Sequence, residues 1–489
     1  MENNMNGTKK VRTRFAPSPT GYMHIGNLRS ALYAYLFARA NDGTFILRIE
    51  DTDRERYVEG AVDLIYRVLK EVGMNWDEGP DVGGDFGPYV QSERKPMYLP
   101  YAEQLIKSGH AYRCFCTKEE LDERRSAAQE RGETFKYDKH CMHLSETEIQ
   151  EKLRAGIPYV IRQNVPTEGK TSFTDEIFGE ITVDNSELDD SVLIKADGMP
   201  TYNFANVIDD HTMGISHVMR GMEYLSSTPK YNLLYEAFGW EIPKYIHMTP
   251  VMRDAQHKLS KRDGDASYED FTSKGYMMEA IVNYIALLGW NPGDEREKFT
   301  LEELAKAFSV KGMSKSPAIF DPIKLRWLNS EYIRELDEAA FTRHAMEWYE
   351  KSGIAHMDTS VLYKILGQRV EVFSDIPDMT DFLSKLDESY STELFTNKKS
   401  KTNEQISRDI LTDVIPVIES IPEWNESSIH DTLMNYAAGH EMKNGTLLWP
   451  VRIALAGKQV TPGGAIEIAV LLGREESMRR LKLGLAKLS

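Results

Sequence analysis

A sharp turn near the start of the chain, between a short β-type run and a helix, restricts the fold more than any other stretch. The β-type run covers residues 11–16, and the turn P-S-P-T-G follows at 17–21. Each proline fixes its own φ angle, and the glycine accepts backbone conformations that other residues avoid. The apolar residues that follow recur at helical spacing and predict one apolar stripe against a sheet. These residues are Leu28, Ala31, Leu32, Tyr35 and Leu36.

The beginning of this helix is a predicted anion site, and phosphate is the obvious anion. The first backbone N–H groups of a helix have no partner within it, and the helix dipole favours negative charge there. His24 can donate a hydrogen bond to a phosphoryl oxygen, and Gly26 leaves room for a base or a ribose. The alternative is that His24 only caps the helix. An isolated H-x-G motif favours that alternative, because so short a motif recurs by chance.

The whole stretch P-S-P-T-G-Y-M-H-I-G-N, residues 17–27, resembles the first signature of class I aminoacyl-tRNA synthetases, and in particular their glutamyl and glutaminyl branch. Asn27 stands where many class I enzymes have a second histidine, but this branch varies at that position. The resemblance implies an α/β fold with a Rossmann-type parallel sheet in the catalytic domain.

Length and composition predict several domains and a protein without a membrane partner. A chain of 489 residues exceeds what one core usually organises. Its hydrophobic share of 41% and charged share of 28% are ordinary for a globular protein, and no apolar leader or membrane span is visible. The net charge of -17 would repel a polyanion, so any RNA contact must be local. We expect a cytoplasmic protein.

Acidic residues follow a predicted buried strand at 44–49, within the motif R-I-E-D-T-D. Glu50, Asp51 and Asp53 therefore stand at the carboxyl end of a strand, where open α/β sheets bind ligands. The alternative is a solvated acidic loop. In the family this motif lines the amino-acid site, and Q-S-E-R at 91–94 also resembles the family. A helix is predicted over residues 59–72 between these two motifs, and strands are predicted near 159–162 and 179–183 further along the chain.

All three cysteines fall within one segment, as C-F-C at 114–116 and C-M-H at 141–143. Three thiolates and an imidazole form a complete tetrahedral set for one structural zinc ion per chain, and many glutamyl-tRNA synthetases carry a site of this spacing. The alternative is three unrelated buried thiols, and the odd number of cysteines fits a reducing compartment. Tyr137 and His140 are alternative fourth ligands. The predicted ligands are Cys114, Cys116, Cys141 and His143.

A second nucleotide signal is K-L-S-K-R at 258–262, which follows a strand-like run. A glycine-flanked loop with two lysines, Lys258 and Lys261, can neutralise charge as pyrophosphate leaves. G-M-S-K-S at 312–316 is closer to the class I consensus K-M-S-K-S, but it follows no predicted strand. We therefore interpret it as an ordinary loop.

The amino-acid pocket is assigned from the resemblance. Tyr202 and Asn206 are four residues apart and are predicted on one helical face, while Arg220 and Glu223 are predicted on another helical turn. The alternative, from spacing alone, is that Arg220 and Glu223 are polar residues on the surface. The resemblance implies that Arg14 pairs with the γ-carboxylate of glutamate and that Ser18 and Glu50 hold its α-amino group. The implied glutamate-binding residues are Arg14, Ala16, Ser18, Glu50, Tyr202, Asn206 and Arg220. The implied ATP-binding residues are His24, Gly26, Asn27, Glu223, Lys258 and Lys261, of which His24, Lys258 and Lys261 are catalytic.

Helical periodicity, as in Ile406, Ile410, Leu411, Val414 and Ile418, replaces strand signals towards the C-terminus. The resemblance implies an all-α anticodon-binding domain there. Trp449 and Arg452 are candidates for stacking on and reading an anticodon base, with Pro450 breaking the helix beside them. Arg369 is a further candidate, and the alternative for Trp449 is a core position. The expected domains are residues 1–97 and 195–255 for the two catalytic halves, 98–194 for the insertion with the zinc site, 256–336 for the lysine loop and stem-contact region, and 337–489 for the anticodon domain.

Together these motifs, from about Arg12 onward, resemble the bacterial-type glutamyl-tRNA synthetases. The resemblance implies a monomer that uses ATP with Mg²⁺ to join L-glutamate to tRNA(Glu), with tRNA(Gln) as a further candidate substrate. One rival is a glutaminyl-tRNA synthetase, which typically carries C-terminal β-barrels that the helical periodicity opposes. The other rival is a catalytically inactive tRNA-binding protein, which would not need His24 and a loop with Lys258 and Lys261.

Overall fold

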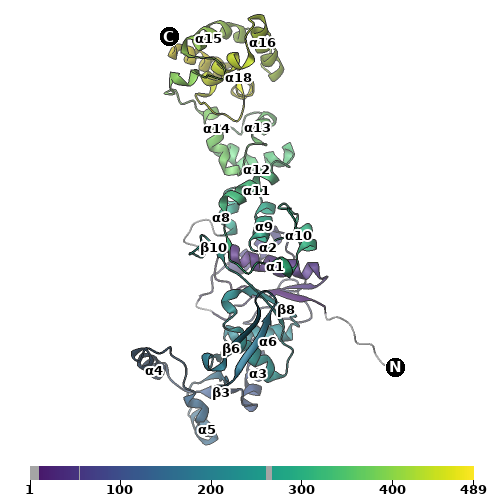
Figure 1. Cartoon of the computed structure of the whole chain (residues 1–489), viewed down its shortest axis with the longest axis vertical. Helices are drawn as coiled ribbons and strands as arrows, with labels where there is room; N and C mark the ends of the chain where they lie inside the picture. Colours follow the sequence, from purple (N-terminus) through teal and green to yellow (C-terminus); the bar gives the residue numbers. More distant parts are fainter. Residues whose placement is uncertain (1–9, 54–55, 260–266) are drawn as a thin grey trace, which may run out of the picture. The chain divides into compact units, whose positions relative to one another are not determined.

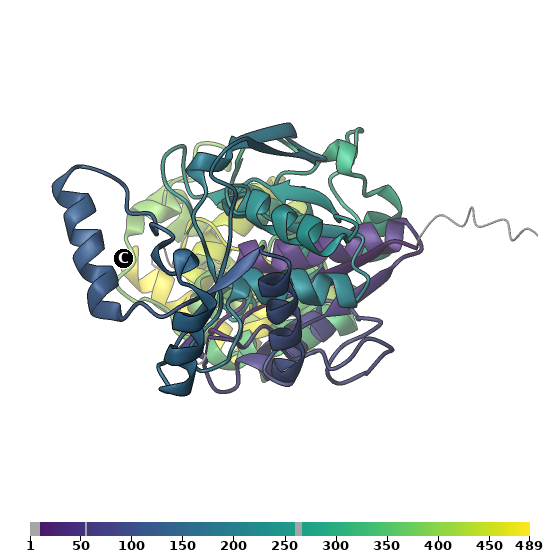
Figure 2. The same cartoon turned by 90° about the horizontal axis from the view of Figure 1, so that it is seen from below.

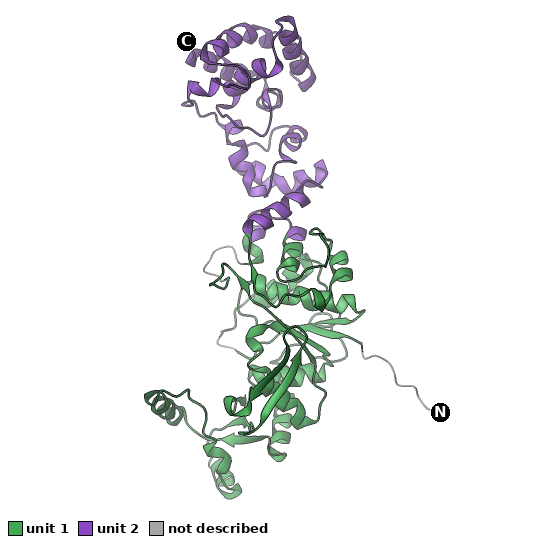
Figure 3. Ribbon diagram, viewed as in Figure 1, with its two compact units in different colours: residues 1–270, 281–321 green, residues 271–280, 322–489 purple. Residues whose placement is uncertain are grey.

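The computed structural model describes residues 10–53, 56–259 and 267–489. The chain divides into two compact units (Figure 3). Unit 1 comprises residues 1–270 and 281–321, and unit 2 comprises residues 271–280 and 322–489.

Parallel strands form the centre of unit 1, as the fold prediction requires. β1 (Arg12–Phe15) pairs in parallel with β2 (Thr44–Leu47), and β8 (His217–Gly221) pairs in parallel with β9 (Lys244–Met248). The backbone N–H of Ser216 donates to the carbonyl of Arg12 at 3.0 Å and brings β8 beside β1. The hairpin of β5 (Lys170–Asp175) and β6 (Gly179–Asp184) joins β9 on its other side, giving the order β6-β5-β9-β8. The parallel-sheet prediction is confirmed.

Helix α1 (Ile25–Ala40) follows the turn, but the predicted single apolar stripe is wrong. The helix is buried on nearly all sides, because α10 (Leu301–Ala307) packs against it in addition to β1, β2 and β8. Tyr33, outside the predicted stripe, is buried and donates its hydroxyl to the carbonyl of Leu288 at 2.9 Å, whereas Tyr35 is only partly buried.

Four further helices of unit 1 connect its strands, and β10 (Val251–Met252) pairs in parallel with β11 (Ala318–Ile319). The helix predicted over residues 59–72 is confirmed as α2. These helices are α2 (Ala61–Glu71), α3 (Lys95–Lys107), α6 (Tyr202–Thr212) and α7 (Thr228–Phe238). Two further helices, α8 (Tyr268–Thr272) and α9 (Met278–Leu287), contain residues of both units.

The segment with the cysteines has its own antiparallel sheet of β3 (Ala111–Cys114), β4 (Val160–Gln163) and β7 (Val192–Ile194). The strands predicted near 159–162 and 179–183 are confirmed as β4 and β6. Helices α4 (Lys118–Glu130) and α5 (Glu146–Arg154) each begin with a capping box. In both views α4 lies at the edge of unit 1, away from the sheets (Figures 1 and 2), and it buries only Ala128.

Unit 2 contains no β-strand among its residues, all of which the structure describes, so the prediction of an all-α C-terminal domain is confirmed. Its core consists of apolar side chains from successive helices, including the predicted periodic residues Ile410, Leu411 and Val414. No helix in the described part of the chain is both long and apolar enough to cross a membrane. The helices are α11 (Pro322–Ile333), α12 (Glu338–Lys351), α13 (Thr359–Leu366), α14 (Ile376–Ser384), α15 (Glu404–Glu419), α16 (Glu426–Gly439), α17 (Asn444–Ala456) and α18 (Ala465–Lys487).

Candidate functional site

A pocket of about 350 Å³ opens where β1, β2 and β8 end and where α1 and α6 begin. This is the carboxyl edge of the parallel strands, where the sequence predicts ligand binding. The pocket collects most of the residues predicted to bind glutamate, together with two predicted to bind ATP. The predicted residues that line it are Arg14, Ala16, Ser18, Asn27, Glu50, Tyr202, Arg220 and Glu223.

Four other predicted residues that the structure describes, Asn206, His24, Gly26 and Lys258, do not line this pocket. Asn206 lies one turn after Tyr202 on α6, as predicted, but is buried and donates its side-chain amide to the carbonyl of Tyr202 at 2.9 Å. His24 caps α1, because its Nδ1 accepts the backbone N–H of Gly26 at 3.1 Å. This contact supports the alternative that His24 caps the helix. Lys258 is exposed and pairs with Met252 in a β-bridge. Lys261 lies outside the described residues.

The predicted helical turn for Arg220 and Glu223 is wrong. Arg220 lies on strand β8, and Glu223 lies in the 3-10 turn that follows, Met222–Tyr224. The strand sits between β1 and β9, so it buries Arg220 to 6% exposure instead of leaving it on the surface. Both side chains nevertheless line the pocket.

Arg14 is held in place by Asp210 of α6. Its Nε donates to Oδ1 at 3.1 Å and its Nη2 donates to Oδ2 at 3.3 Å, while Nη1 donates to the carbonyl of Met219 at 3.3 Å. Because a guanidinium carries five N–H donors, two of those on Arg14 lie outside these three bonds. Burial opposes the charge on Asp210, but Arg14 and Arg48 hold the pKa of its carboxyl below its usual value.

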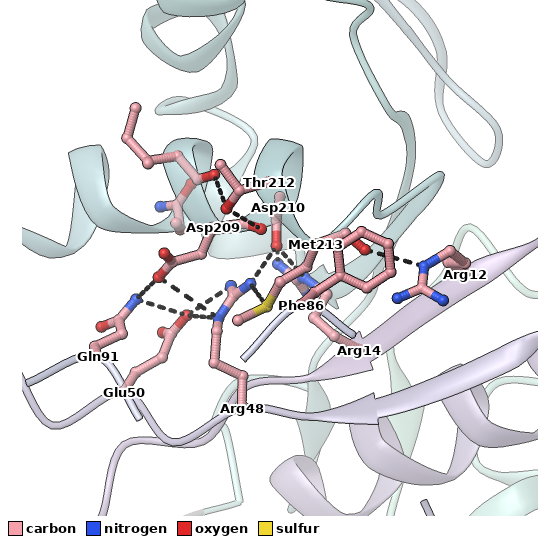
Figure 4. A network of polar contacts seen from close by, with 12 residues as sticks. Arg12, Arg14, Arg48, Glu50, Phe86, Gln91, Asp209, Asp210, Thr212 and Met213 are labelled. Atoms are coloured by element: carbon pink, nitrogen blue, oxygen red, sulfur yellow. Dashed lines mark hydrogen bonds and ion pairs between the residues drawn. The ribbon is translucent and has the colours of Figure 1, made fainter. Parts of the chain in front are cut away.

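Behind the pocket lies a network of buried charges that sequence reasoning missed (Figure 4). Arg48 donates to Asp210 at 2.8 Å and to Glu50 at 2.9 Å. Arg94 donates to Asp209 at 2.6 Å, and Gln91 donates to the other oxygen of Asp209 at 2.9 Å.

The charges of this network balance, because three guanidinium groups face three carboxylates. Burial raises the pKa of Glu50, although Arg48 and Arg14 act in the opposite direction. The sequence does mark the missed residues. Arg48 lies in R-I-E-D-T-D, and Gln91 and Arg94 lie in Q-S-E-R. Asp209 and Asp210 follow the apolar residues Val207 and Ile208 in α6. The buried ions are Arg14, Arg48, Arg94, Glu50, Asp209 and Asp210.

The sulfur atoms of Cys114, Cys116 and Cys141 all lie within 4.8 Å of one another. A tetrahedral zinc ion with sulfurs at about 2.3 Å places those sulfurs roughly 3.8 Å apart, so the three thiols fit a zinc site. Tyr137 is buried beside them, with its hydroxyl oxygen 3.3 Å from the sulfurs of Cys114 and Cys116.

His143, the first choice for the fourth ligand, is exposed and lies outside the three-cysteine group. His140 is exposed as well. Both histidines belong to the same 3-10 helix as Cys141, His140–His143, and in that helix only Cys141 is buried. The tight turn therefore directs the cysteine, and not its neighbours, towards the other sulfurs.

Comparison with known proteins agrees with this geometry. Residues 10–327 match the family model of tRNA synthetases class I (E and Q), catalytic domain, and residues 326–485 match an anticodon binding domain. The glutamate–tRNA ligase of Clostridium acetobutylicum is 58% identical over 482 residues, which are 98% of this chain and 99% of that protein. The glutamate–tRNA ligase of Clostridium tetani is 58% identical over 484 residues, covering 99% of both chains.

The chain belongs to the glutamate–tRNA ligase family. A crystal structure of a glutamate tRNA ligase from Elizabethkingia meningosepticum in complex with its amino acid superposes with a TM-score of 0.88 at 35% identity. That match covers 98% of this chain and 100% of the other. A family member of this kind is a class I synthetase with a catalytic and an anticodon-binding domain.

Lys258 and Leu259, the described residues of K-L-S-K-R, come after strand β10 in the chain, whereas G-M-S-K-S begins in a 3-10 turn, Val310–Gly312, and not after a strand. That segment leads into β11, which pairs with β10, and Lys315 within it is exposed.

A second pocket of about 350 Å³ lies in unit 2 and collects the residues suggested for the anticodon, Arg369, Trp449 and Arg452. The Arg452 guanidinium lies 4.7 Å from the centre of the Trp449 ring and donates to the hydroxyl of Thr461 at 3.1 Å. The prediction that Pro450 breaks the helix is wrong, because α17 continues through it. Pro450 is the seventh residue of α17, and the side chains project from an unbroken helix.

Proposed function

We propose that this chain joins L-glutamate to the 3′ end of tRNA(Glu) in two steps. The α-carboxylate of glutamate attacks the α-phosphorus of ATP, so that glutamyl adenylate forms and pyrophosphate leaves. The terminal ribose hydroxyl of the tRNA then attacks the acyl carbon, and AMP leaves. One observation carries the proposal: the pocket brings Arg14, Arg220 and Glu50 together in a chain that is 58% identical to glutamate–tRNA ligases.

Glutamate fits this pocket by charge. Arg14 and Arg220 can face its γ-carboxylate, with Tyr202 beside them, while Glu50 and Ser18 can accept from its α-ammonium group. Asp210 holds the guanidinium of Arg14 in a fixed orientation before glutamate binds. Less conformational entropy of the side chain is therefore lost when glutamate binds.

ATP is expected next to glutamate, at the beginning of α1. Asn27 and Glu223 line the pocket there, and His24 and Gly26 form the first turn of the helix. Positive charge at the departing pyrophosphate would come from Lys258 and Lys261, with Mg²⁺ bound to the nucleotide. The protein positions the reacting groups and stabilises charge, and it forms no covalent bond to the substrate.

We further propose one structural zinc ion held by Cys114, Cys116 and Cys141 with Tyr137 as the fourth ligand. The hydroxyl of Tyr137 is the group that the structure places against the sulfurs, whereas His143 is exposed. Burial raises the pKa of Tyr137, so its phenol keeps the proton unless a cation is bound. Zinc would join β3 to the segment around Cys141 and supply folding free energy there.

The pocket of Arg369, Trp449 and Arg452 is our candidate for reading the anticodon, since an aromatic ring and a guanidinium are the groups that recognise unstacked bases. Binding of this kind is local and is compatible with the net charge of -17. The expected partners are tRNA(Glu), with tRNA(Gln) as a second candidate, and the protein would act as a cytoplasmic monomer.

Pyrophosphate exchange and charging assays test the proposal directly. The purified protein should exchange pyrophosphate into ATP with glutamate but not with glutamine, in the presence of tRNA(Glu), and should charge that tRNA. Lys261→Ala should lose about two orders of magnitude in adenylate formation, and Lys315→Ala, the matched control in G-M-S-K-S, should be close to wild type. Exchange with glutamine alone, or no exchange at all, would contradict the proposed reaction.

A further inference from the structure

Arg220 is held from behind by two hydrogen bonds and by aromatic rings. Its Nε donates to Nε2 of His247 at 3.1 Å, and its Nη2 donates to the hydroxyl of Thr228 at 2.9 Å. The rings of Tyr224, Tyr231 and Tyr245 lie between 4.8 and 5.4 Å from the guanidinium carbon. Among the residues that the structure describes, Nη1 has no hydrogen-bond partner, and the side chain lines the glutamate pocket.

The contact with Arg220 fixes the tautomer of His247. A guanidinium has no acceptor, so Nε2 of the imidazole must accept the Arg220 N–H. The proton of a neutral ring then sits on Nδ1 and is donated to Oδ2 of Asp175, which lies 2.7 Å away. Both side chains are fully buried, and burial lowers the pKa of His247, so the ring is neutral near pH 7.

Asp175 is fixed by the backbone around it. Its carboxylate accepts the backbone N–H of His247 at 3.0 Å and those of Ile177 and Phe178 at 2.9 Å each. Asp175 ends strand β5 of the inserted hairpin, His247 lies on β9 and Arg220 lies on β8. A chain of three side chains thus runs across three neighbouring strands and ends at the pocket.

We propose that His247 is a positioning residue that orients the guanidinium of Arg220 towards the side-chain carboxylate of glutamate. This inference rests on the proposed function. An arginine side chain has many rotamers, and an acceptor on Nε selects the one that turns the remaining N–H groups into the pocket. Asp175 keeps the acceptor nitrogen of His247 facing Arg220.

Two substitutions of His247 test the roles of the two ring nitrogens, Nδ1 and Nε2, separately. In His247→Asn the amide lies near the place of Nδ1, so a donor to Asp175 remains while the acceptor for Arg220 is lost. In His247→Gln the longer side chain places an acceptor near Nε2 and restores the contact with Arg220. His217→Asn, at the start of the adjacent strand β8 and outside the pocket, is the matched control.

The measurement is steady-state charging of tRNA(Glu) with glutamate and ATP varied separately. His247→Asn should raise the KM for glutamate by about tenfold or more, as expected for the loss of a buried hydrogen bond to a charged group, with the KM for ATP nearly unchanged. His247→Gln should bring the KM for glutamate back to within about threefold of wild type, and His217→Asn should leave it unchanged.

A wild-type KM for glutamate in His247→Asn, or equal losses in the Asn and Gln variants, would overturn the inference. Should His247→Asn fail to fold, Thr228→Val removes the hydroxyl that accepts from Arg220 and also lies 3.4 Å from Nε2 of His247, without touching Asp175, and it should raise the same KM by about threefold. An unchanged KM in that variant would also contradict the inference. Failure of the wild-type protein to charge glutamate would instead contradict the proposed function.

Discussion

The floor of the pocket in unit 1 buries charges, whereas the helical core of unit 2 buries apolar side chains. Six buried ions meet behind the pocket, centred on Arg48 and Asp210. In unit 2, all of whose residues are described, Arg480 is the one buried charged side chain, and it donates to backbone carbonyls at Phe382 and Leu455. Both units also bury apolar side chains, so what distinguishes the pocket floor of unit 1 is its group of paired buried ions.

This difference indicates that the buried ions of unit 1 have a role other than stabilising the fold. Removing ions from water costs several kcal/mol each, and replacing a buried ion network by packed apolar groups is often neutral or stabilising. Stability alone therefore does not explain the network, whereas a fixed orientation of Arg14 and Glu50 in the pocket does. The core of unit 2 has the simpler role of holding its helices together.

Among the substitutions that test this comparison, Asp210→Asn is expected to have the largest effect on stability. The substitution keeps the shape but removes the charge that faces Arg14 and Arg48, and breaking a buried ion network in this way costs about 3 to 5 kcal/mol. Hydrogen exchange of peptides from β1 and α6 should become faster, while peptides from unit 2 keep their wild-type rates. Unchanged exchange in unit 1 would mean that the network contributes nothing to its stability.

Leu411→Ala is the matched change in the apolar core. Leu411 on α15 is fully buried, and its truncation should destabilise unit 2 by about 2 to 5 kcal/mol through lost burial and a cavity. Hydrogen exchange should now quicken in peptides from unit 2 and stay constant in those from β1 and α6. Faster exchange in both units would contradict the view that each core supports its own unit.

The same contrast explains what the sequence could predict. The helical periodicity of apolar residues is visible within a short segment of sequence, so the helices of unit 2 around Leu411 can be predicted from the sequence. The ion network depends on partners far apart in the chain, since Arg94 and Asp209 are 115 residues apart and Arg14 and Asp210 are 196 apart. No local pattern pairs such residues.

Predictions from local sequence patterns also failed for residues whose burial depends on tertiary packing. Arg220 looks like a surface residue by spacing, but two neighbouring strands bury it. Helix α1 is buried beyond its predicted apolar stripe because α10, more than 260 residues later in the chain, covers its other side. Most predicted pocket residues did lie together, because their motifs mark the carboxyl ends of strands.

Arg452→Ala tests the polar pocket of unit 2, the exception to its apolar character. Removal of a base contact should cost about 1 to 3 kcal/mol in charging of tRNA(Glu), and the chemistry of adenylate formation should stay unchanged. The comparison is with a tRNA that carries a mutated anticodon. An equal loss on both tRNAs would reduce Arg452 to a structural contact with Thr461 and the backbone carbonyl of Gln459.

A smaller effect is expected from acid. The folded-state pKa of Asp210 is lowered, so its contribution to stability is present above the unfolded-state value of about 3.9 and is lost as the pH falls through the folded-state value. Unit 1 of the wild type should therefore lose stability as the pH falls below about 4, and Asp210→Asn should show a shallower slope. Parallel slopes in the two proteins would contradict this assignment.

The most direct test of the account measures glutamate-dependent pyrophosphate exchange, with tRNA(Glu) present, in Asp210→Asn and Leu411→Ala at a temperature where both remain folded. If the buried charges serve the pocket, Asp210→Asn should lose about tenfold or more in kcat/KM for glutamate, while Leu411→Ala should stay close to wild type despite a similar loss of stability. Equal activity of the two variants would contradict the central claim, because the network would then be no more than another way to fill a core.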